Sequence, residues 1–215
     1  MTVEDPVEYK SESISQIQVN EKVGLTFASA LRSILRQDPD IIMIGEIRDE
    51  ETASIAIRAA LTGHLVFSTL HTNSAIATIA RLKDMGIEPF LISSSLLGIL
   101  SQRLVRTLYP ACKEEDTSAE NVAKDYDLTQ GHALFKASGC AECNFTGYQG
   151  RQSVGELLLM DDTIQDILKQ TQDENKIKEY LKEKDFITID DQLKTLLLKG
   201  ETSLDEAIRI GLRHA

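Results

Sequence analysis

Charged side chains follow three short apolar segments of the chain, at positions where buried strands would end. Glu4 and Asp5 follow the first segment, Glu46 follows the second, and His71 follows the third. In open α/β sheets, ligands bind beyond the carboxyl ends of the strands. Carboxylates there can hold Mg²⁺ or orient a nucleophile, and an imidazole can contact a phosphate. The sequence therefore places Glu4, Asp5, Glu46 and His71 where chemistry would take place.

Thr2–Glu8, the first of these segments, places two adjacent carboxylates at the end of a strand, and Pro6 fixes the following turn. Glu4 and Asp5 could hold Mg²⁺ through water or orient a nucleophile. An acidic turn that only closes the strand is the alternative, and on this segment alone it is the simpler interpretation.

Asp38–Asp49, the second segment, contains a hydrophobic strand that delivers Glu46 at its tip. A carboxylate in this place is typical of a Walker B strand, where it binds the metal or polarises water for attack on a γ-phosphate. Gly45 lets the backbone come close at that tip. Asp40 and Arg48, which flank the strand, are further candidates for nucleotide contacts. Because strands that end in an acidic residue are common, a structural role stays open.

Thr62–Asn73, the third segment, places a histidine on each side of a strand. We expect His64, which precedes the strand, to be structural. His71 lies at the carboxyl end of the strand and is the better functional candidate. Together with Thr72 it offers hydrogen-bond donors for a phosphate.

The elements that must position these residues alternate between short apolar strands and amphipathic helices, which predicts an α/β fold. The predicted strands cover residues 2–3, 14–19, 41–44 and 65–69, and the predicted helices cover 27–35, 50–61 and 91–100.

The second half of the chain has a different pattern. Residues 113–131 are polar and acidic and predict an exposed excursion. A strand region at 153–159 precedes helical patterns at 163–170, 177–184, 193–198 and 204–212. We therefore expect three regions, namely an α/β part over 1–108, a cysteine-containing insert over 109–146 and a strand and helical subdomain over 147–215.

The composition is that of an acidic globular protein. The 215 residues include 23 Lys and Arg against 34 Asp and Glu, so the formal charge is −11. Hydrophobic residues make up 42% and charged residues 27%, which argues against disorder. No apolar run approaches the ~20 residues that span a bilayer, and the first residues do not resemble a signal peptide, so we expect a cytoplasmic chain. The negative charge argues against a nucleic-acid partner.

The three charged segments, in this order and spacing, resemble the Asp box, Walker B box and His box of the secretion ATPases that drive type II secretion and type IV pilus assembly. The resemblance continues through Gln102–Arg106, Gly147–Arg151 and Ser203–Ala207, so it covers nearly the whole chain.

This resemblance implies part of a RecA-like P-loop NTPase core, followed by a small, mostly helical C-terminal subdomain. It also implies a hexamer that hydrolyses ATP with Mg²⁺ and moves an inner-membrane platform protein, so the motor would be cytoplasmic and peripheral at the inner membrane. By position, Glu46 would be the catalytic or metal-polarising glutamate, and Glu4 and Asp5 the Asp-box carboxylates. His71 would be the His-box phosphate contact.

A P-loop of the form GxxxxGK[ST], whose backbone amides cradle the phosphates, is absent from the sequence. In the family that the chain resembles, this loop lies just before the Asp box. We therefore expect the chain to be the distal half of the motor domain and, alone, to bind nucleotide weakly or not at all. An ATPase-dead scaffold that inserts into hexamers through the same surfaces is the alternative.

Three cysteines form a separate candidate metal site. An odd number excludes a closed disulfide framework, and Cys140 and Cys143 have a spacing that suits a metal. In the assembly and secretion branch of the family that the chain resembles, two CxxC pairs hold a tetrahedral zinc ion. Here Tyr109 occupies the first ligand position before Cys112. A fourth ligand from His132, a water or a carboxylate could complete a Zn²⁺ site, and a degenerate site with free thiols is the alternative.

Arginines could also serve a hexamer, because a guanidinium can reach a neighbouring subunit's γ-phosphate. Arg32, Arg36 and Arg48 flank the predicted Walker B strand and are candidates for this role. Pairing with nearby acidic residues is the simpler interpretation for each of them.

Overall fold

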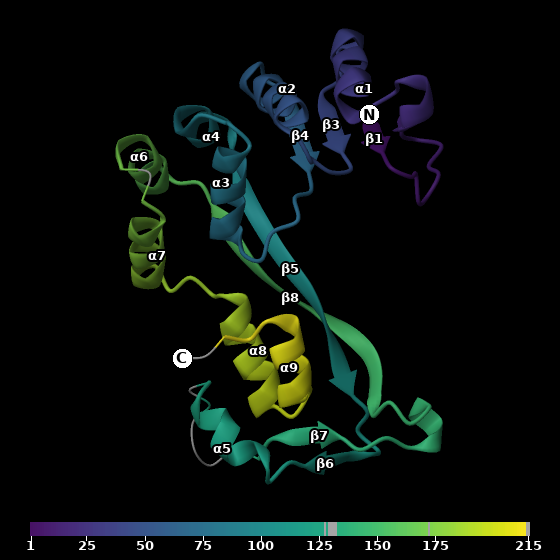
Figure 1. Ribbon diagram of the computed structural model, residues 1–215, viewed down its shortest axis with the longest axis vertical. Coiled ribbons are helices and arrows are strands. Elements are labelled where there is room, and N and C mark those ends of the chain that lie inside the picture. Colours follow the sequence, from purple (N-terminus) through teal and green to yellow (C-terminus); the bar gives the residue numbers. More distant parts are fainter. Residues whose placement is uncertain (127, 129–132, 172, 214–215) are drawn as a thin grey trace. The chain divides into compact units, whose positions relative to one another are not determined.

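The computed structural model describes residues 1–126, 128, 133–171 and 173–213 (Figure 1). It divides into two compact units. The first unit comprises Met1–Ile99 and Leu158–Lys184, and the second comprises Leu100–Leu157 and Asp185–Ala215. The range 147–215, which the sequence groups together, contributes helices to both units.

A parallel four-stranded sheet forms the centre of the first unit. Its strands lie in the order β2-β1-β3-β4, and all neighbouring pairs are parallel. The strands are β1 (Thr2–Glu4), β2 (Gln16–Gln18), β3 (Ile41–Ile44) and β4 (Leu65–Ser68). Because the strands are parallel, their carboxyl ends share one edge of the sheet.

Two helices pack against one face of this sheet, namely α1 (Phe27–Ile34) and α2 (Glu50–Leu61) (Figure 1). Each begins at a side-chain cap. Thr26 accepts a hydrogen bond from the backbone N–H of Ser29, and Asp49 accepts one from Thr52. Such caps satisfy backbone donors that have no partner within the helix.

The two faces of β3 differ in exposure because side chains alternate along a strand. Ile42 and Ile44 are fully buried. Ile41 and Met43 are 51% and 38% exposed, and Leu65 and Phe67 of β4 are 39% and 56% exposed. These four side chains form an apolar strip, which we call the open sheet face.

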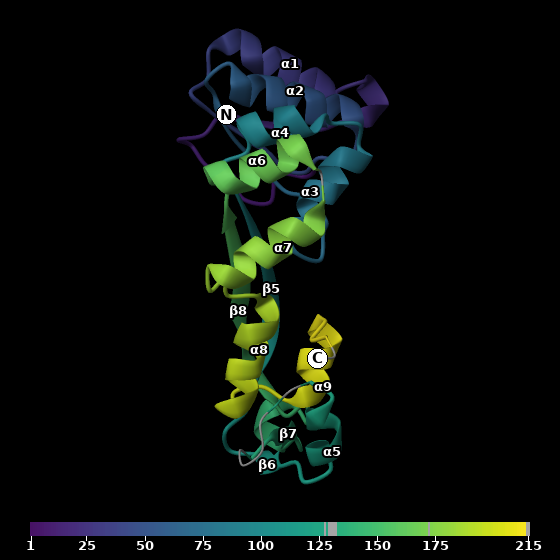
Figure 2. The same ribbon diagram turned by 90° about the vertical axis from the view of Figure 1, so that its left-hand side faces the viewer.

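Four further helices complete the first unit: α3 (Ala75–Asp84), α4 (Pro89–Ser95), α6 (Asp162–Gln170) and α7 (Glu174–Glu183). α4 contacts α6 and α2, and α3 contacts α7 (Figure 2). The helix predicted over 91–100 ends at Ser95, because Gly98–Leu108 forms strand β5 and pairs with β8 (Tyr148–Leu159). An apolar run of this length fits either a helix or a strand, and pairing with a distant segment decides between them.

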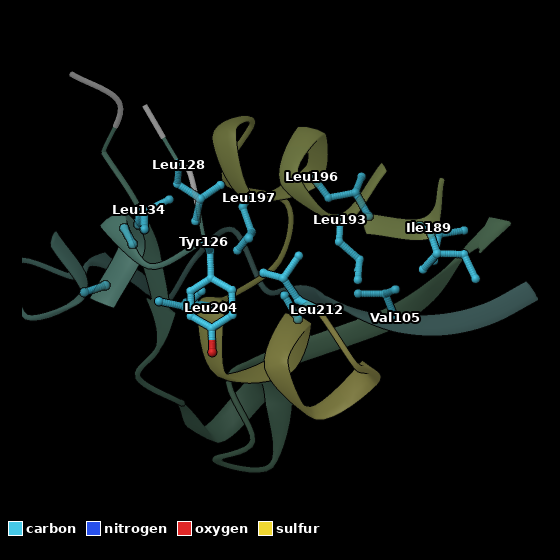
Figure 3. Close-up of a cluster of buried hydrophobic side chains, with 14 residues drawn as sticks. Val105, Tyr126, Leu128, Leu134, Ile189, Leu193, Leu196, Leu197, Leu204 and Leu212 are labelled. Atoms are coloured by element: carbon cyan, nitrogen blue, oxygen red, sulfur yellow. The ribbon is translucent and has the colours of Figure 1, made fainter. Parts of the chain in front are cut away.

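The second unit has a hydrophobic core of its own, shown in Figure 3. It is built around α8 (Ile189–Leu198) and α9 (Leu204–Ile210), and strand β5 contributes Val105. The region 113–131, expected to be an exposed excursion, contains strand β6 (Lys113–Glu115), which pairs with β7 (Phe135–Ala137), and helix α5 (Ala119–Lys124). Tyr126, which follows α5, lies in the core, while residues 127 and 129–131 lie outside the described residues.

A buried carboxylate, Glu206 of α9, connects distant parts of the second unit. It accepts hydrogen bonds from the Arg106 backbone N–H and Nε, both at 2.9 Å, and from the Arg209 Nε at 2.6 Å. The Arg106 guanidinium also lies 4.1 Å from the ring centre of Tyr148. Burial opposes ionisation of Glu206, but the bonds from Arg209 and Arg106 outweigh it and lower its pKa to about 2.

Glu206→Gln is therefore expected to lower the free energy of unfolding by about 2–3 kcal/mol, the magnitude of hydrogen bonds to a charged group. The folded pKa of Glu206 lies below the usual value of 4.5, so its stabilisation is complete above that pH and is lost as the pH falls toward 2. Urea unfolding of both proteins at a series of pH values measures this effect. A difference that stays constant down to pH 2 would contradict the assignment.

Candidate functional site

The carboxyl edge of the four-stranded sheet brings Glu46, Arg48 and His71 together. The backbone N–H of Gly45 donates to the Val3 carbonyl at 2.8 Å, so the tips of β1 and β3 lie side by side. A Cβ atom at position 45 would lie 3.2 Å from the Val3 carbonyl oxygen and 3.3 Å from the Glu4 Cα. Glycine thus allows the close approach that the sequence suggested at this tip.

Glu46 lies at the centre of this edge. Its Oε1 accepts a hydrogen bond from the Arg48 guanidinium at 2.6 Å, and its Oε2 lies 3.5 Å from the His71 Nε2. The Glu46 side chain is only 16% exposed, whereas that of His71 is 90% exposed. The hydrogen bond from Arg48 lowers the pKa of Glu46, so the carboxylate is ionised at neutral pH.

Arg48 pairs with Glu46 and lies in the negative field of further carboxylates. The pKa of Arg48 is raised, mainly by its hydrogen bond to Glu46, and the negative charges of Asp5 and Glu21 add to the effect. Asp5 is exposed, whereas Glu4 is partly buried and engaged locally. Its Oε1 accepts hydrogen bonds from the Thr2 hydroxyl at 2.5 Å and from the Gln16 amide at 3.0 Å.

The other two residues that were predicted to contact the nucleotide, Thr72 and Asp40, lie at different places in the first unit. The Thr72 hydroxyl contacts the buried Thr78 hydroxyl at 2.8 Å, just before α3. Asp40 precedes β3 at its amino end, where its carbonyl accepts a hydrogen bond from the Leu65 N–H at 3.0 Å. The structure therefore does not bring Asp40 to the edge that carries Glu46.

Other polar residues named from the sequence have local contacts. The His64 Nδ1 lies 3.0 Å from the Ala59 carbonyl at the end of α2, which agrees with a structural role. Arg32 pairs with Glu51 of α2, and Arg36 contacts the Ser33 hydroxyl at 3.4 Å.

Thr69 is a residue of this edge that the sequence did not indicate. Its hydroxyl donates to the Gly45 carbonyl at 2.5 Å, and its own carbonyl accepts from the Ile47 N–H at 3.0 Å. These two bonds hold the end of β4 against the segment that carries Glu46. The only signal in the sequence for a role of Thr69 was its position at the end of the strand predicted over 65–69.

A second cluster, of three free cysteines, lies in the second unit. The Cys143 Sγ is 3.8 Å from the Cys112 Sγ and 3.7 Å from the Cys140 Sγ, and all three sulfurs lie within 4.8 Å of one another. Tetrahedral zinc with Zn–S bonds of about 2.3 Å requires S···S separations of about 3.8 Å. The donor set and its spacing therefore fit a zinc ion.

The backbone around the cluster favours a thiolate at Cys143. The N–H groups of Cys140 and Gly147 each lie 3.2 Å from its sulfur. Burial opposes ionisation, but these two hydrogen bonds outweigh it and lower the pKa of Cys143 to about 6. The loop is tightly built, because a Cβ at Gly147, where φ is +73°, would lie 2.5 Å from the Ala137 Cβ.

The chain has three cysteines, so a fourth ligand would have to be of another type. The Tyr109 hydroxyl donates to the Glu142 Oε2, and this hydrogen bond raises the pKa of Tyr109 to about 12. His132, the other fourth ligand considered from the sequence, lies outside the described residues.

The helices of the described residues include none that is both long and apolar enough to cross a membrane.

Comparison with known proteins relates this geometry to a family. A family model described as "Type II/IV secretion system protein" matches residues 1–209. The type II secretion system protein E of Dickeya dadantii is 52% identical over 210 residues, which cover 98% of this chain and 42% of the relative. The type II secretion system ATPase E of Vibrio cholerae is 50% identical over 212 residues, which cover 98% of this chain and 42% of that relative. The type IV pilus assembly ATPase PilB of Thermus thermophilus is 49% identical over 211 residues, 96% of this chain and 24% of PilB.

Solved structures of ATPases share the fold. The pilus retraction motor PilT with bound ADP matches with a TM-score of 0.69 and 32% identity over 99% of this chain and 52% of PilT. The Legionella pneumophila ATPase DotB matches with a TM-score of 0.66 and 25% identity over 97% of this chain and 50% of DotB. The predicted α/β, RecA-like fold class is confirmed. The chain spans less than half the length of the curated relatives named above, and it belongs to the Type II/IV secretion system protein family.

Proposed function

We propose that this chain supplies the hydrolytic edge of an ATPase motor for type II secretion or type IV pilus assembly. The observation that carries the proposal is the ionised Glu46, held by Arg48 at 2.6 Å and 3.5 Å from His71 at the carboxyl edge of a parallel sheet. A carboxylate at this place can polarise the attacking water or hold Mg²⁺.

The neighbouring residues have distinct proposed roles. Asp5 and Glu4, on the adjacent strand, contribute the negative charge that attracts Mg²⁺, directly or through water. His71 and Thr72 contact the phosphates of ATP, since both lie between the end of β4 and the start of α3. Arg48 keeps Glu46 ionised and oriented.

The phosphate cradle must come from elsewhere in such a motor. The sequence contains no GxxxxGK[ST] motif, and the curated relatives are more than twice as long as the matched segment. We therefore propose that the P-loop belongs to a segment of the longer motor, that the open sheet face packs against that segment, and that this chain alone does not hydrolyse ATP. The motor would act as a hexamer on the cytoplasmic side of the inner membrane, against a platform protein.

We also propose a structural zinc ion at Cys112, Cys140 and Cys143. Zinc there would cross-link the turn before β6 to the turn before β8, because its thiolate ligands come from both. It supplies rigidity and no step of ATP hydrolysis.

A chimeric ATPase tests the proposed activity. In it, this chain replaces the 212 matched residues of the Vibrio cholerae ATPase E, to which it is 50% identical. We expect Mg²⁺-dependent ATP hydrolysis by the chimera, and no ATP binding in calorimetry of the 215-residue chain alone. Hydrolysis by the chain alone would show that the phosphate cradle lies within it.

A scaffold without hydrolysis is the second candidate, and the absence of the P-loop motif from the sequence favours it. A folded chimera that binds ATP without hydrolysing it would support this alternative. In that case, adding the 215-residue chain to the intact Vibrio cholerae ATPase should also reduce its activity by mixed assembly.

A further inference from the structure

Two turns of the cysteine cluster are closed by the same type of backbone hydrogen bond. The Cys112 N–H donates to the Tyr109 carbonyl at 3.2 Å, and the Cys143 N–H donates to the Cys140 carbonyl at 3.2 Å. Both turns thus end in a cysteine three residues after their first residue. Tyr109 stands in the first turn where Cys140 stands in the second.

Tyr109 cannot place a donor atom where a cysteine would. The phenolic oxygen lies several ångströms farther from the backbone than a cysteine sulfur, so it extends past the position that a fourth thiolate would take. The Tyr109 hydroxyl instead donates to the Glu142 carboxylate. The Tyr109 backbone N–H donates to the Gly147 carbonyl at 2.9 Å, and the Gly147 N–H lies 3.2 Å from the Cys143 sulfur, so Tyr109 lies beside the cluster.

Among the described residues, the donor atoms that lie within 4.8 Å of one another come from Cys112, Cys140 and Cys143 alone, so the Glu142 carboxylate is not itself in the place of a ligand. We propose that the fourth coordination position of this zinc site takes a water molecule held by Glu142, and that Tyr109 orients Glu142. The inference rests on the zinc binding proposed above. Zinc accepts a water oxygen as its fourth ligand, and groups that hydrogen-bond to a metal ligand fix the orientation of that ligand. Tyr109 is a positioning residue in this arrangement, not a ligand.

Zinc affinity in four variants tests this arrangement. We expect Tyr109→Cys to bind zinc about tenfold more tightly or better, because it adds a fourth thiolate. Glu142→Gln and Tyr109→Phe should weaken binding by about 10–100-fold, the usual effect of losing a hydrogen-bonded ligand shell. In the Tyr109→Cys background, Glu142→Gln should have little effect, since the fourth ligand is then a thiolate. Chelator competition on the full 215-residue chain measures all four affinities, with circular dichroism to confirm folding.

Cobalt substitution gives a second, independent readout. The Co²⁺-loaded chain should show d–d bands of an S₃O set, and Tyr109→Cys should shift them toward those of an S₄ set. Added imidazole should change the spectrum because it displaces the water, and an unchanged spectrum would contradict a water as the fourth ligand.

Several results would overturn the inference and distinguish it from failure of zinc binding itself. A chain that neither carries nor binds zinc removes the zinc site altogether. Tight zinc binding that Glu142→Gln leaves unchanged, or weakens equally in both backgrounds, removes only the role of Glu142. Loss of zinc in a His132→Asn variant, together with an S₃N cobalt spectrum, would assign the fourth ligand to His132 instead.

Discussion

Glu46→Gln in the chimeric ATPase is expected to lower ATP turnover by about 10²–10⁴-fold, the usual contribution of a positioned general base. The amide keeps the size of the side chain but loses the negative charge that Arg48 and His71 surround. Because we propose that the phosphate cradle lies in another part of the chimera, ATP affinity should change little. Steady-state hydrolysis together with equilibrium binding of a fluorescent nucleotide separates the two effects.

Asp40→Asn is the matched control for this prediction. It removes an acidic charge that flanks the same strand, but before its amino end. Six residues of extended chain separate positions 40 and 46 by roughly 20 Å. Turnover by the Asp40→Asn chimera should therefore stay near that of the parent. Equal losses in both variants would point to a general destabilisation of β3, and unchanged turnover in Glu46→Gln would remove Glu46 from the chemistry.

Removal of zinc is expected to have the largest effect on stability. A metal bound at a thousand times its dissociation constant stabilises the folded chain by about 4 kcal/mol. For a chain of 215 residues this corresponds to a fall in Tm of about 8–16 °C. Thermal unfolding under reducing conditions, with and without EDTA, measures it.

Cys143→Ser provides the control for the chelator. Its sulfur is the one that lies within 3.8 Å of both other thiols, so its loss should abolish tight binding. The variant should melt at the temperature of the EDTA-treated parent and show no further response to EDTA. If EDTA lowers both melting temperatures alike, its effect does not come from this cluster.

The strands and their functional ends could be predicted from the sequence because both signals are local. A short apolar run marks β3 and β4, and the charged residue that follows each run marks the carboxyl edge. The proximity of Arg48 and His71 to Glu46 then follows from parallel pairing. The same rule places Asp40 at the opposite, amino edge, because it precedes β3 in the sequence.

Contacts between distant segments could not be predicted in this way. The amphipathic patterns of α6 and α7 indicate that each has a buried face, but not that these faces pack on α4 and α3. The region 113–131 lacks an apolar period, and β6 and α5 form there because β7 and the core of the second unit provide partners. The hydrogen bond between Tyr109 and Glu142 likewise depends on the folded turn.

The order in which the chain passes through its two units has a consequence for synthesis on the ribosome. The second unit begins at Leu100, is interrupted by Leu158–Lys184, and resumes at Asp185. β5 therefore emerges long before α8 and α9, which supply most of the leucines around Val105. Since contacts of large sequence separation form slowly, apolar residues of β5 stay exposed until the last helices are translated. We therefore expect the apolar side chains of β5 that pack in this core to stay unpaired while the roughly one hundred residues between β5 and the end of α9 are translated.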